Sequence, residues 1–351
     1  MNGNNRTRKP DSQSPVPTHQ YIDSETGQVL TEQLFGDPLI RFIYSDLRER
    51  IPLMYEAVTN ARMSSILGFL NFETKLGARL CGQRRWLRNN RINLDECMEP
   101  PHRLDTPGKV FERKIRYWET RPMPTQSNCV VSPADSRVIA GSFDDHSLLE
   151  IKNKFFDFEE LLAKDKTQWL ETFRHGSFLI FRLTPEKYHF NHLPVAGRVV
   201  DVYDIPGNYH SCNPTAVVHL VTPYSKNKRS VTIINTDVPG GTGVGMVAMI
   251  EVVALMIGDI QQCYSAERYD NPVPIASGMF LKRGQPKSLF RPGSSTTVLM
   301  FENNRICFNP RLLFNQRHPW AQSRFTKSFG KPLVETDIKV RSWVATAKEV
   351  E

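Results

Sequence analysis

FRPGSSTTVLMF, residues 290–301, joins a glycine–serine bond to hydroxyl side chains and then to an apolar run. Gly293 has no Cβ, so the backbone can bend until the Ser294 hydroxyl meets the Gly293 carbonyl carbon. An N-to-O acyl shift and loss of the Ser294 α-proton would break the chain and leave a dehydroalanine, which water converts to a pyruvoyl group. The following TTVLMF is typical of a strand. The stretch predicts a self-cleaving precursor.

Two other segments carry the side chains that such chemistry needs. A serine hydroxyl is a weak nucleophile and requires a base and a group that orients the base. Asp135 lies in SPADSRV (132–138), and His189 and His192 lie in LTPEKYHFNHLPVAGRV (183–199). The aspartate could instead be a turn former, and the histidines a structural or metal-binding pair. Prolines bracket the histidines and no zinc-protease glutamate follows, so no metal site is predicted.

In this order, the SPAD, YHFNHLP and Gly293–Ser294 motifs resemble the phosphatidylserine decarboxylase family. The similarity extends to flanking segments and covers roughly residues 110–305. The flanking segments are FERKIRYWETRPMP (111–124), IKNKFFDFEELL (151–162) and VGMVAMIEVVALMIGDI (244–260).

The resemblance implies a role for each motif residue. Asp135 would orient His192, and His192 would accept the Ser294 proton during cleavage. The pyruvoyl group formed from Ser294 is the implied cofactor; it would condense with the substrate amine and act as an electron sink while carbon dioxide leaves. His189 would then return a proton to the substrate carbon, since an imidazole titrates near working pH.

Several positions depart from the family pattern. Ser136 replaces the usual glycine after the aspartate. KRGQPKSLF (282–290) replaces KGxELGxF and lacks its glutamate and second glycine. Pro292 fixes its own φ just before the cleavage site. The doubled serine leaves Ser294 and Ser295 as candidate nucleophiles, and Ser294 is preferred because the family cuts directly after the glycine.

Composition favours an anionic partner. The chain has 351 residues, of which 40% are hydrophobic and 23% charged, and a formal net charge of +8. Such a charge suits a membrane surface bearing phosphatidylserine. The basic run RRWLRNNR (84–91) has no recognisable nucleic-acid motif around it, so no nucleic-acid partner is predicted.

Cysteine usage and hydropathy indicate a cytoplasmic protein with at most peripheral membrane contact. The six cysteines are scattered without a C-x-x-C pair, which is typical of reduced thiols. The first twenty residues lack the apolar core of a secretory signal. No apolar run reaches the roughly 20 residues that a transmembrane helix needs. An apolar stripe between Met54 and Leu80 is more typical of a core-facing helix than of a membrane anchor.

The chain divides into three parts. Residues 1–38 form a polar, proline-rich tail that we expect to be disordered. Residues 39–109 show helical periodicity and end in a linker, CMEPPHRLDTPGK (97–109). Residues 110–351 form the decarboxylase-like domain, in which short apolar runs between turns predict a mainly antiparallel sheet or barrel-like core in an α+β fold. These runs are FLIFRL, GRVVDVYDI, TAVVHLV, SVTIINT and TTVLMF.

The resemblance implies that cleavage gives a large chain, 1–293, and a small pyruvoyl chain, 294–351, that stay interleaved; a homo-oligomer is compatible with the sequence. GGTGVG (240–245) lacks the nucleotide-binding register and predicts a hairpin turn. The tail after residue 306, with ICFNPRLLF and HPW, has no assigned role.

Three functions stay open at this point. The first is a pyruvoyl-dependent decarboxylase acting on phosphatidylserine, or alternatively on a soluble aromatic amino acid such as tryptophan. The second is an uncleaved family member that acts as a binding protein. The third is a serine hydrolase using Asp135, His192 and Ser294, which the missing G-x-S-x-G motif disfavours.

Overall fold

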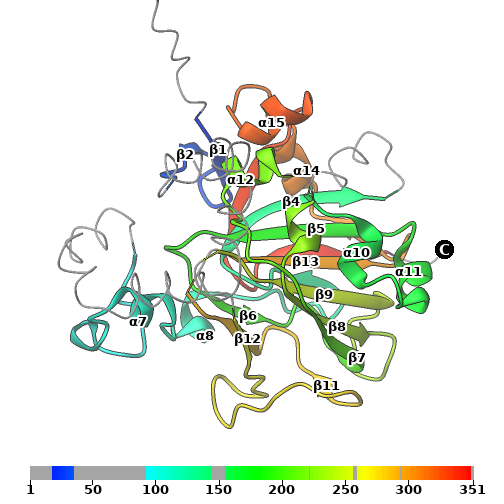
Figure 1. Cartoon of the computed structure of the whole chain (residues 1–351). Helices are drawn as coiled ribbons and strands as arrows, with labels where there is room; N and C mark the ends of the chain where they lie inside the picture. Colours follow the sequence, from blue (N-terminus) through cyan, green and yellow to red (C-terminus); the bar gives the residue numbers. More distant parts are fainter. Residues whose placement is uncertain are drawn as a thin grey trace, which may run out of the picture.

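A computed structural model of the chain describes residues 18–34, 92–143, 155–220, 222–255, 259–292 and 295–348 (Figure 1). Within these residues, one ten-stranded sheet and two three-stranded sheets make up most of the fold, and short helices lie around them. The predicted helical region between residues 39 and 96 falls mostly on 35–91, which lie outside the described residues.

The large sheet is open, with β11 and β2 as its outer strands, so among the described residues it does not close into a barrel. All its strand pairs are antiparallel except β1 with β15. The order across the sheet is β11 (Phe280–Leu281), β7 (Gly197–Ile205), β8 (Arg229–Asn235), β9 (Met246–Val252), β13 (Ser295–Phe301), β5 (Ser177–Leu183), β4 (Ser136–Ser142), β15 (Glu335–Ile338), β1 (Gln20–Asp23) and β2 (Val29–Thr31).

β13 is a central strand, and all seven of its residues are buried. Successive side chains of a strand point to opposite faces of the sheet. Val298 and Met300 accordingly join one hydrophobic cluster, whereas Leu299 and Phe301 join the cluster on the other face. A strand covered on both faces needs a continuous apolar run, which explains why TTVLMF does not alternate with polar residues.

Two small sheets pack beside the large one. The first contains β10 (Ile260–Gln262), β12 (Pro286–Phe290) and β6 (Phe190–His192). The second contains β14 (Ile306–Phe308), β16 (Trp343–Ala347) and β3 (Cys129–Val131). Because β12 precedes the expected cleavage site and β13 follows it, that site connects the first small sheet to the middle of the large sheet (Figure 1).

The described helices are short. They are η3 (Pro101–Arg103), α7 (Pro107–Phe111), α8 (Tyr117–Thr120), α10 (Phe158–Leu162), α11 (Thr167–Phe173), α12 (Pro214–His219), α13 (Pro223–Lys226), α14 (Pro310–Gln316) and α15 (Arg324–Phe329). Of these, α10, α11, α12 and α15 pack on one face of the large sheet, where their apolar side chains share a cluster with Val298 and Met300. None of the described helices has the length and apolar character needed to cross a membrane.

The prediction of a strand at TAVVHLV (215–221) was wrong, because residues 215–219 lie in helix α12. The β-branched residues favour a strand, but local chemistry at the helix start prevails. The Asn213 side chain accepts a hydrogen bond from the Thr215 backbone N–H, and Pro214 occupies the first helical position. An asparagine cap followed by proline is a strong signal for a helix start.

The prediction that residues 1–38 are disordered was wrong for residues 18–34. Residues 20–23 and 29–31 form the β1–β2 hairpin, and β1 pairs with β15 in the large sheet. The polar composition does not exclude order here, because charged side chains of this segment are buried in ion pairs. The linker 97–109 is also partly ordered, since it contains η3 and the start of α7.

Two further fold predictions agree with the structure. The core is mainly antiparallel, and the α+β class is confirmed. GGTGVG lies in the connection between the antiparallel strands β8 and β9. Gly240, Gly243 and Gly245 in that connection all have positive φ angles, which only glycine adopts at little cost.

Candidate functional site

The segment expected to be cleaved is defined by its neighbours, since Gly293 and Ser294 themselves lie outside the described residues. Pro292 on one side is buried, and Ser295 on the other begins β13. Ser295 pairs with Leu183 of β5. Its side-chain oxygen is buried and has no hydrogen-bond partner among the described residues. Such a group is uncommon in folded proteins and marks a place where another partner is expected.

His192 is fully buried and held from both ring nitrogens. Nδ1 lies 2.9 Å from the Gly284 carbonyl oxygen, and Nε2 lies 2.9 Å from the Tyr188 hydroxyl. A carbonyl can only accept, so Nδ1 carries the proton and the unprotonated Nε2 accepts from the Tyr188 hydroxyl. Burial lowers the pKa of His192 to about 3, so the ring is neutral at physiological pH. This is the protonation state that a general base requires.

Asp135 is held by a guanidinium. Its two carboxylate oxygens accept hydrogen bonds from Arg121 at 2.9 and 2.7 Å, and one of them also accepts from the Val340 backbone N–H at 2.8 Å. Burial alone would raise the pKa of Asp135, but Arg121 outweighs it and lowers the pKa to about 2. Arg121 also donates to both oxygens of Glu96, at 2.8 and 3.1 Å. The aspartate is therefore charged and paired.

Asp135 and His192 come from adjoining segments but are not joined by a side-chain hydrogen bond. The connection is through the backbone, where the His192 N–H donates to the Pro133 carbonyl at 2.7 Å. In this structure the Gly284 carbonyl orients the imidazole instead. The predicted role of Asp135 in orienting His192 therefore stays a prediction.

His189 lies beside the end of β12. Its carbonyl accepts a hydrogen bond from the Phe290 N–H at 3.1 Å, four residues before Ser294. Its ring stacks on Phe111, with 3.4 Å between centroids and an interplanar angle of 21°. Phe111 and Phe290 belong to one small buried cluster with Ala134 and Leu183. This cluster brings together the segments of Asp135, His189 and the cleavage site.

Within the part of the chain that the structure describes, neither ring nitrogen of His189 makes a hydrogen bond of normal geometry, although both are buried. Burial, followed by the nearby positive charge of Arg113, lowers the pKa of His189 well below its usual range. The ring is therefore neutral and has unused hydrogen-bonding capacity next to the cleavage segment.

A buried polar network that the sequence analysis did not identify joins the strands around this site. We call it the Glu251 network; its members are Asn191, Glu251, Gln262, Lys287, Ser288 and Thr297. The Lys287 ammonium lies 2.5 Å from the Glu251 carboxylate, and both side chains are fully buried. Ser288 also donates to Glu251. A β-bulge between Pro286 and Ser288 makes Lys287 the extra residue, so two consecutive side chains reach one carboxylate.

The Glu251 network spans the expected cleavage point. Asn191, which lies between the two histidines, donates to Glu251 at 3.1 Å and accepts from Thr297 at 3.0 Å. Gln262 completes the network, donating to Glu251 at 3.2 Å and accepting from Lys287 at 3.1 Å. The network thus connects β6, β9, β10, β12 and β13. The KSLF departure from the family pattern was its only sequence signal.

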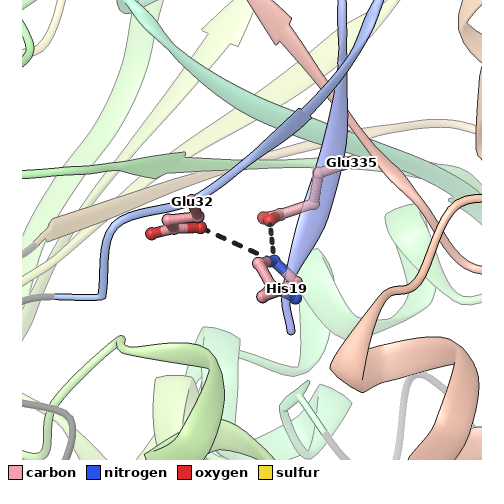
Figure 2. A group of neighbouring side chains, drawn as sticks. All are labelled: His19, Glu32 and Glu335. Carbon is pink, nitrogen blue, oxygen red and sulfur yellow. Dashed lines mark hydrogen bonds and ion pairs between the residues drawn. The ribbon is translucent and has the colours of Figure 1, made fainter. Parts of the chain in front are cut away.

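A second buried cluster lies at the N-terminal hairpin, away from His189 and His192. Figure 2 shows His19, Glu32 and Glu335 with their ligand-type atoms directed toward one another. The His19 Nδ1 accepts from the Arg324 N–H, so Nε2 carries the proton and donates to Glu335 at 2.8 Å. The spacing of these three side chains would suit a metal ion.

Two arginines form ion pairs with the carboxylates of Glu32 and Glu335, in the place that a metal ion would need. Arg182 donates to Glu335 at 2.9 Å and to Glu32 at 2.7 Å, and Arg137 also pairs with Glu32. Their positive charge opposes a cation at this place. Burial disfavours the charged form of Glu32, but the two arginines outweigh burial and lower its pKa to about 2. We call His19, Glu32, Arg137, Arg182 and Glu335 the N-terminal ion-pair cluster.

The fold and the site together define a class of protein. In this class, a strand of a mainly antiparallel sheet begins directly after a glycine–serine pair, and two buried neutral histidines lie beside the segment that leads to it. Comparisons with known proteins identify the family. The family model described as phosphatidylserine decarboxylase matches residues 108–324. The chain therefore belongs to the phosphatidylserine decarboxylase family.

Individual relatives cover most of the chain. A phosphatidylserine decarboxylase proenzyme of Chlamydia trachomatis is 30% identical over 89% of this chain and 96% of its own length. Proteins of the same name from Clostridium tetani and Fusobacterium nucleatum are 27% and 25% identical, over 84% and 85% of this chain and 91% and 92% of their own lengths.

Proposed function

We propose that this chain is a proenzyme that cleaves itself at Gly293–Ser294 and then converts phosphatidylserine to phosphatidylethanolamine and carbon dioxide. The observation that carries the proposal is the pairing of β6 with β12. It places His189 and His192 beside the strand that leads directly into the cleavage segment. Family membership supports the same activity, and the relatives described above give no support to a soluble amino acid as the substrate.

The cleavage step uses the neutral His192. Its Nε2 would exchange the Tyr188 hydroxyl for the reacting serine hydroxyl and take that proton as the oxygen attacks the preceding carbonyl carbon. The amide C–N bond breaks as the ester C–O bond forms, and the proton passes to the released amine. Removal of the serine α-proton then expels the ester as a carboxylate. Water hydrolyses the resulting dehydroalanine to a pyruvoyl end and ammonia.

The surroundings fit a carbonyl group at the start of β13. Ser295 and His189 both hold buried polar atoms without hydrogen bonds of normal geometry next to this point. A pyruvoyl group there would supply an electron sink for the electron pair that the departing carboxylate leaves behind. His189, whose ring is neutral in this structure, would relay a proton to the substrate carbon rather than store one, and its ring position is fixed by the stack on Phe111.

Denaturing electrophoresis with intact mass tests the proposal. Active protein should contain two chains, 1–293 and 294–351, with the smaller one blocked to Edman sequencing. Ser294→Ala should give one uncut chain. If the small chain is shorter by one serine, and Ser295→Ala alone blocks cleavage, then Ser295 is the nucleophile. A single full-length chain in active protein would contradict the proposal and favour the uncleaved binding protein.

The substrate is tested separately. Purified protein is given phosphatidylserine in mixed micelles or tryptophan in buffer, and carbon dioxide release is measured. We expect release from the lipid alone. Release from tryptophan alone would assign the soluble amino acid instead.

A further inference from the structure

The exposed surface of α14 and the turn after it differs from the rest of the described surface. Phe314 is 76% exposed and Trp320 is 84% exposed, whereas the other exposed large apolar side chains of the described residues are at most half exposed. Single exposed apolar residues are normal, but two large aromatic side chains held this far into solvent call for a partner.

The fold keeps both aromatic side chains in solvent. Leu312, Asn315 and Gln316 form the inner side of α14. The Gln316 amide accepts from the Ala140 N–H at 2.8 Å and donates to the Ala140 carbonyl at 3.0 Å, which fixes the helix on β4. Phe314 consequently faces outward.

The Trp320 turn is fixed in a similar way. The His318 ring nitrogen Nδ1 accepts from the backbone N–H groups of Trp320 and Ala321. An open pocket beside the indole is lined by Thr18, Thr326 and Lys327 among others. The aromatic side chains are therefore not exposed through disorder of the backbone that carries them.

The chain segment that carries these aromatic side chains has charges of one sign. Between Glu302 and Glu335 the sequence has six lysines and arginines and no aspartate or glutamate. Arg311 and Arg317 are exposed and lie three residues before and after Phe314, so the three side chains share one side of α14 and its end. Lys327 of α15 is exposed near Trp320.

We propose that Arg311, Phe314, Arg317, Trp320 and Lys327 form an aromatic–basic face that docks the protein on the surface of an anionic phospholipid bilayer. Tryptophan and phenylalanine insert at the headgroup level, and basic residues are attracted to the negative surface potential. This inference rests on the proposed function, because a phosphatidylserine-bearing bilayer is both the substrate source and an anionic surface. In Figure 1, α14 and α15 lie together at one end of the molecule, beside β1 and β2.

Vesicle co-sedimentation of the full chain tests the face. The vesicles are phosphatidylcholine alone, or phosphatidylcholine with phosphatidylserine or with phosphatidylglycerol. The triple variant Arg311→Gln/Arg317→Gln/Lys327→Gln should lower affinity for both anionic vesicles about 100-fold, from roughly one kcal/mol per cation. Phe314→Ala/Trp320→Ala should lower it at least about tenfold.

Matched control variants carry the same changes elsewhere. The charge control removes three exposed cations in and near α11 and β7, and is Lys164→Gln/Arg174→Gln/Arg198→Gln. The aromatic control removes two partly exposed aromatic side chains, and is Phe280→Ala/Trp343→Ala. These controls should bind vesicles as the parent does. Equal losses in test and control variants would overturn the proposal, as would unchanged binding of the test variants. A change in oligomeric state caused by Phe314→Ala/Trp320→Ala would overturn it in favour of a protein partner.

Activity separates this inference from the proposed function. The test variants should keep chain cleavage and carbon dioxide release from soluble short-chain phosphatidylserine, and lose turnover on vesicles. If the parent releases no carbon dioxide from any phosphatidylserine, the proposed function fails while the vesicle-binding result still decides the docking face. If the variants turn over vesicles at the parent rate, the docking face fails and the proposed function stands.

Discussion

At the residue scale, the two histidines of YHFNHLP have different surroundings. His192 is oriented by a carbonyl and a hydroxyl, whereas His189 stacks on Phe111 and its ring nitrogens make no hydrogen bond of normal geometry within the described residues. Both rings are buried and neutral, so the difference between them lies in available partners rather than in charge. This difference supports separate proposed roles, with His192 acting in chain cleavage and His189 acting in turnover of the substrate.

His189→Ala should therefore leave cleavage intact and reduce carbon dioxide release by roughly 10²- to 10⁴-fold, the usual contribution of a positioned acid or base. His192→Ala should leave the chain uncut. Electrophoresis and carbon dioxide release on the two variants make the comparison. The opposite pattern, with His189→Ala uncut and His192→Ala cut, would reverse the two assignments.

At the scale of elements, the Glu251 network holds the strands on either side of the cleavage point. Lys287→Met removes one partner of a fully buried pair and leaves the Glu251 charge uncompensated, which should cost about 3–5 kcal/mol of unfolding free energy. Glu251→Gln/Lys287→Met should recover at least half of that loss. Urea unfolding in an uncleavable Ser294→Ala/Ser295→Ala background provides the measurement.

The exposed pair Lys109–Asp105 supplies the control for this experiment. Both of its side chains are about half exposed, so Lys109→Met should change the unfolding free energy by less than about 1 kcal/mol. Similar losses of unfolding free energy for Lys287→Met and Lys109→Met would show that the buried pair contributes no more to stability than the exposed pair.

The N-terminal ion-pair cluster links the two chains expected after cleavage, because Glu335 lies in 294–351 and its partners lie in 1–293. Despite burial, Arg137 and Arg182 lower the pKa of Glu32 to about 2, and Arg182 lowers the pKa of Glu335. A lowered carboxylate pKa stabilises the fold above the unfolded-state pKa of about 4.3, and this stability is lost as pH falls toward 2. The small chain should therefore be retained at neutral pH and released in strong acid.

Glu335→Gln checks this assignment. It should weaken the association of the small and large chains at pH 7, and this association should then change less between pH 4 and pH 2 than in the parent. Size-exclusion chromatography of the cleaved protein follows the association. Parent and variant releasing the small chain over the same pH range would exclude a role for the cluster in that dependence.

At the scale of the whole molecule, β13 binds the expected small chain to the large one along its full length. It pairs with β5 on one side and β9 on the other, from Thr296 to Phe301 on both. Cleaved protein should thus run as one species on a native column at neutral pH and separate into two chains only in denaturant. Loss of the small chain on simple dilution at pH 7 would contradict this arrangement.

Sequence patterns predicted the parts of the fold that depend on local periodicity. β5, β8 and β13 were found because a buried strand needs apolar runs between turns. α12 was missed because the asparagine cap and proline outweigh its β-branched residues, and the β1–β2 hairpin because its stability comes from distant charges. The site histidines were found through their motif. Their neighbours were not, since Lys287 and Glu251 are 36 residues apart and a bulge brings them together.

The central position of β13 has a consequence for thermal inactivation. The intact precursor folds as one molecule, so β13 reaches its place between β5 and β9 by intramolecular loop closure. Once the chain is cut, the same strand would have to find its place from a separate molecule, at a rate that depends on concentration. Heated enzyme should then fail to regain activity on cooling, while heated uncleavable precursor refolds, so the durability of the mature protein would be set by how slowly it unfolds.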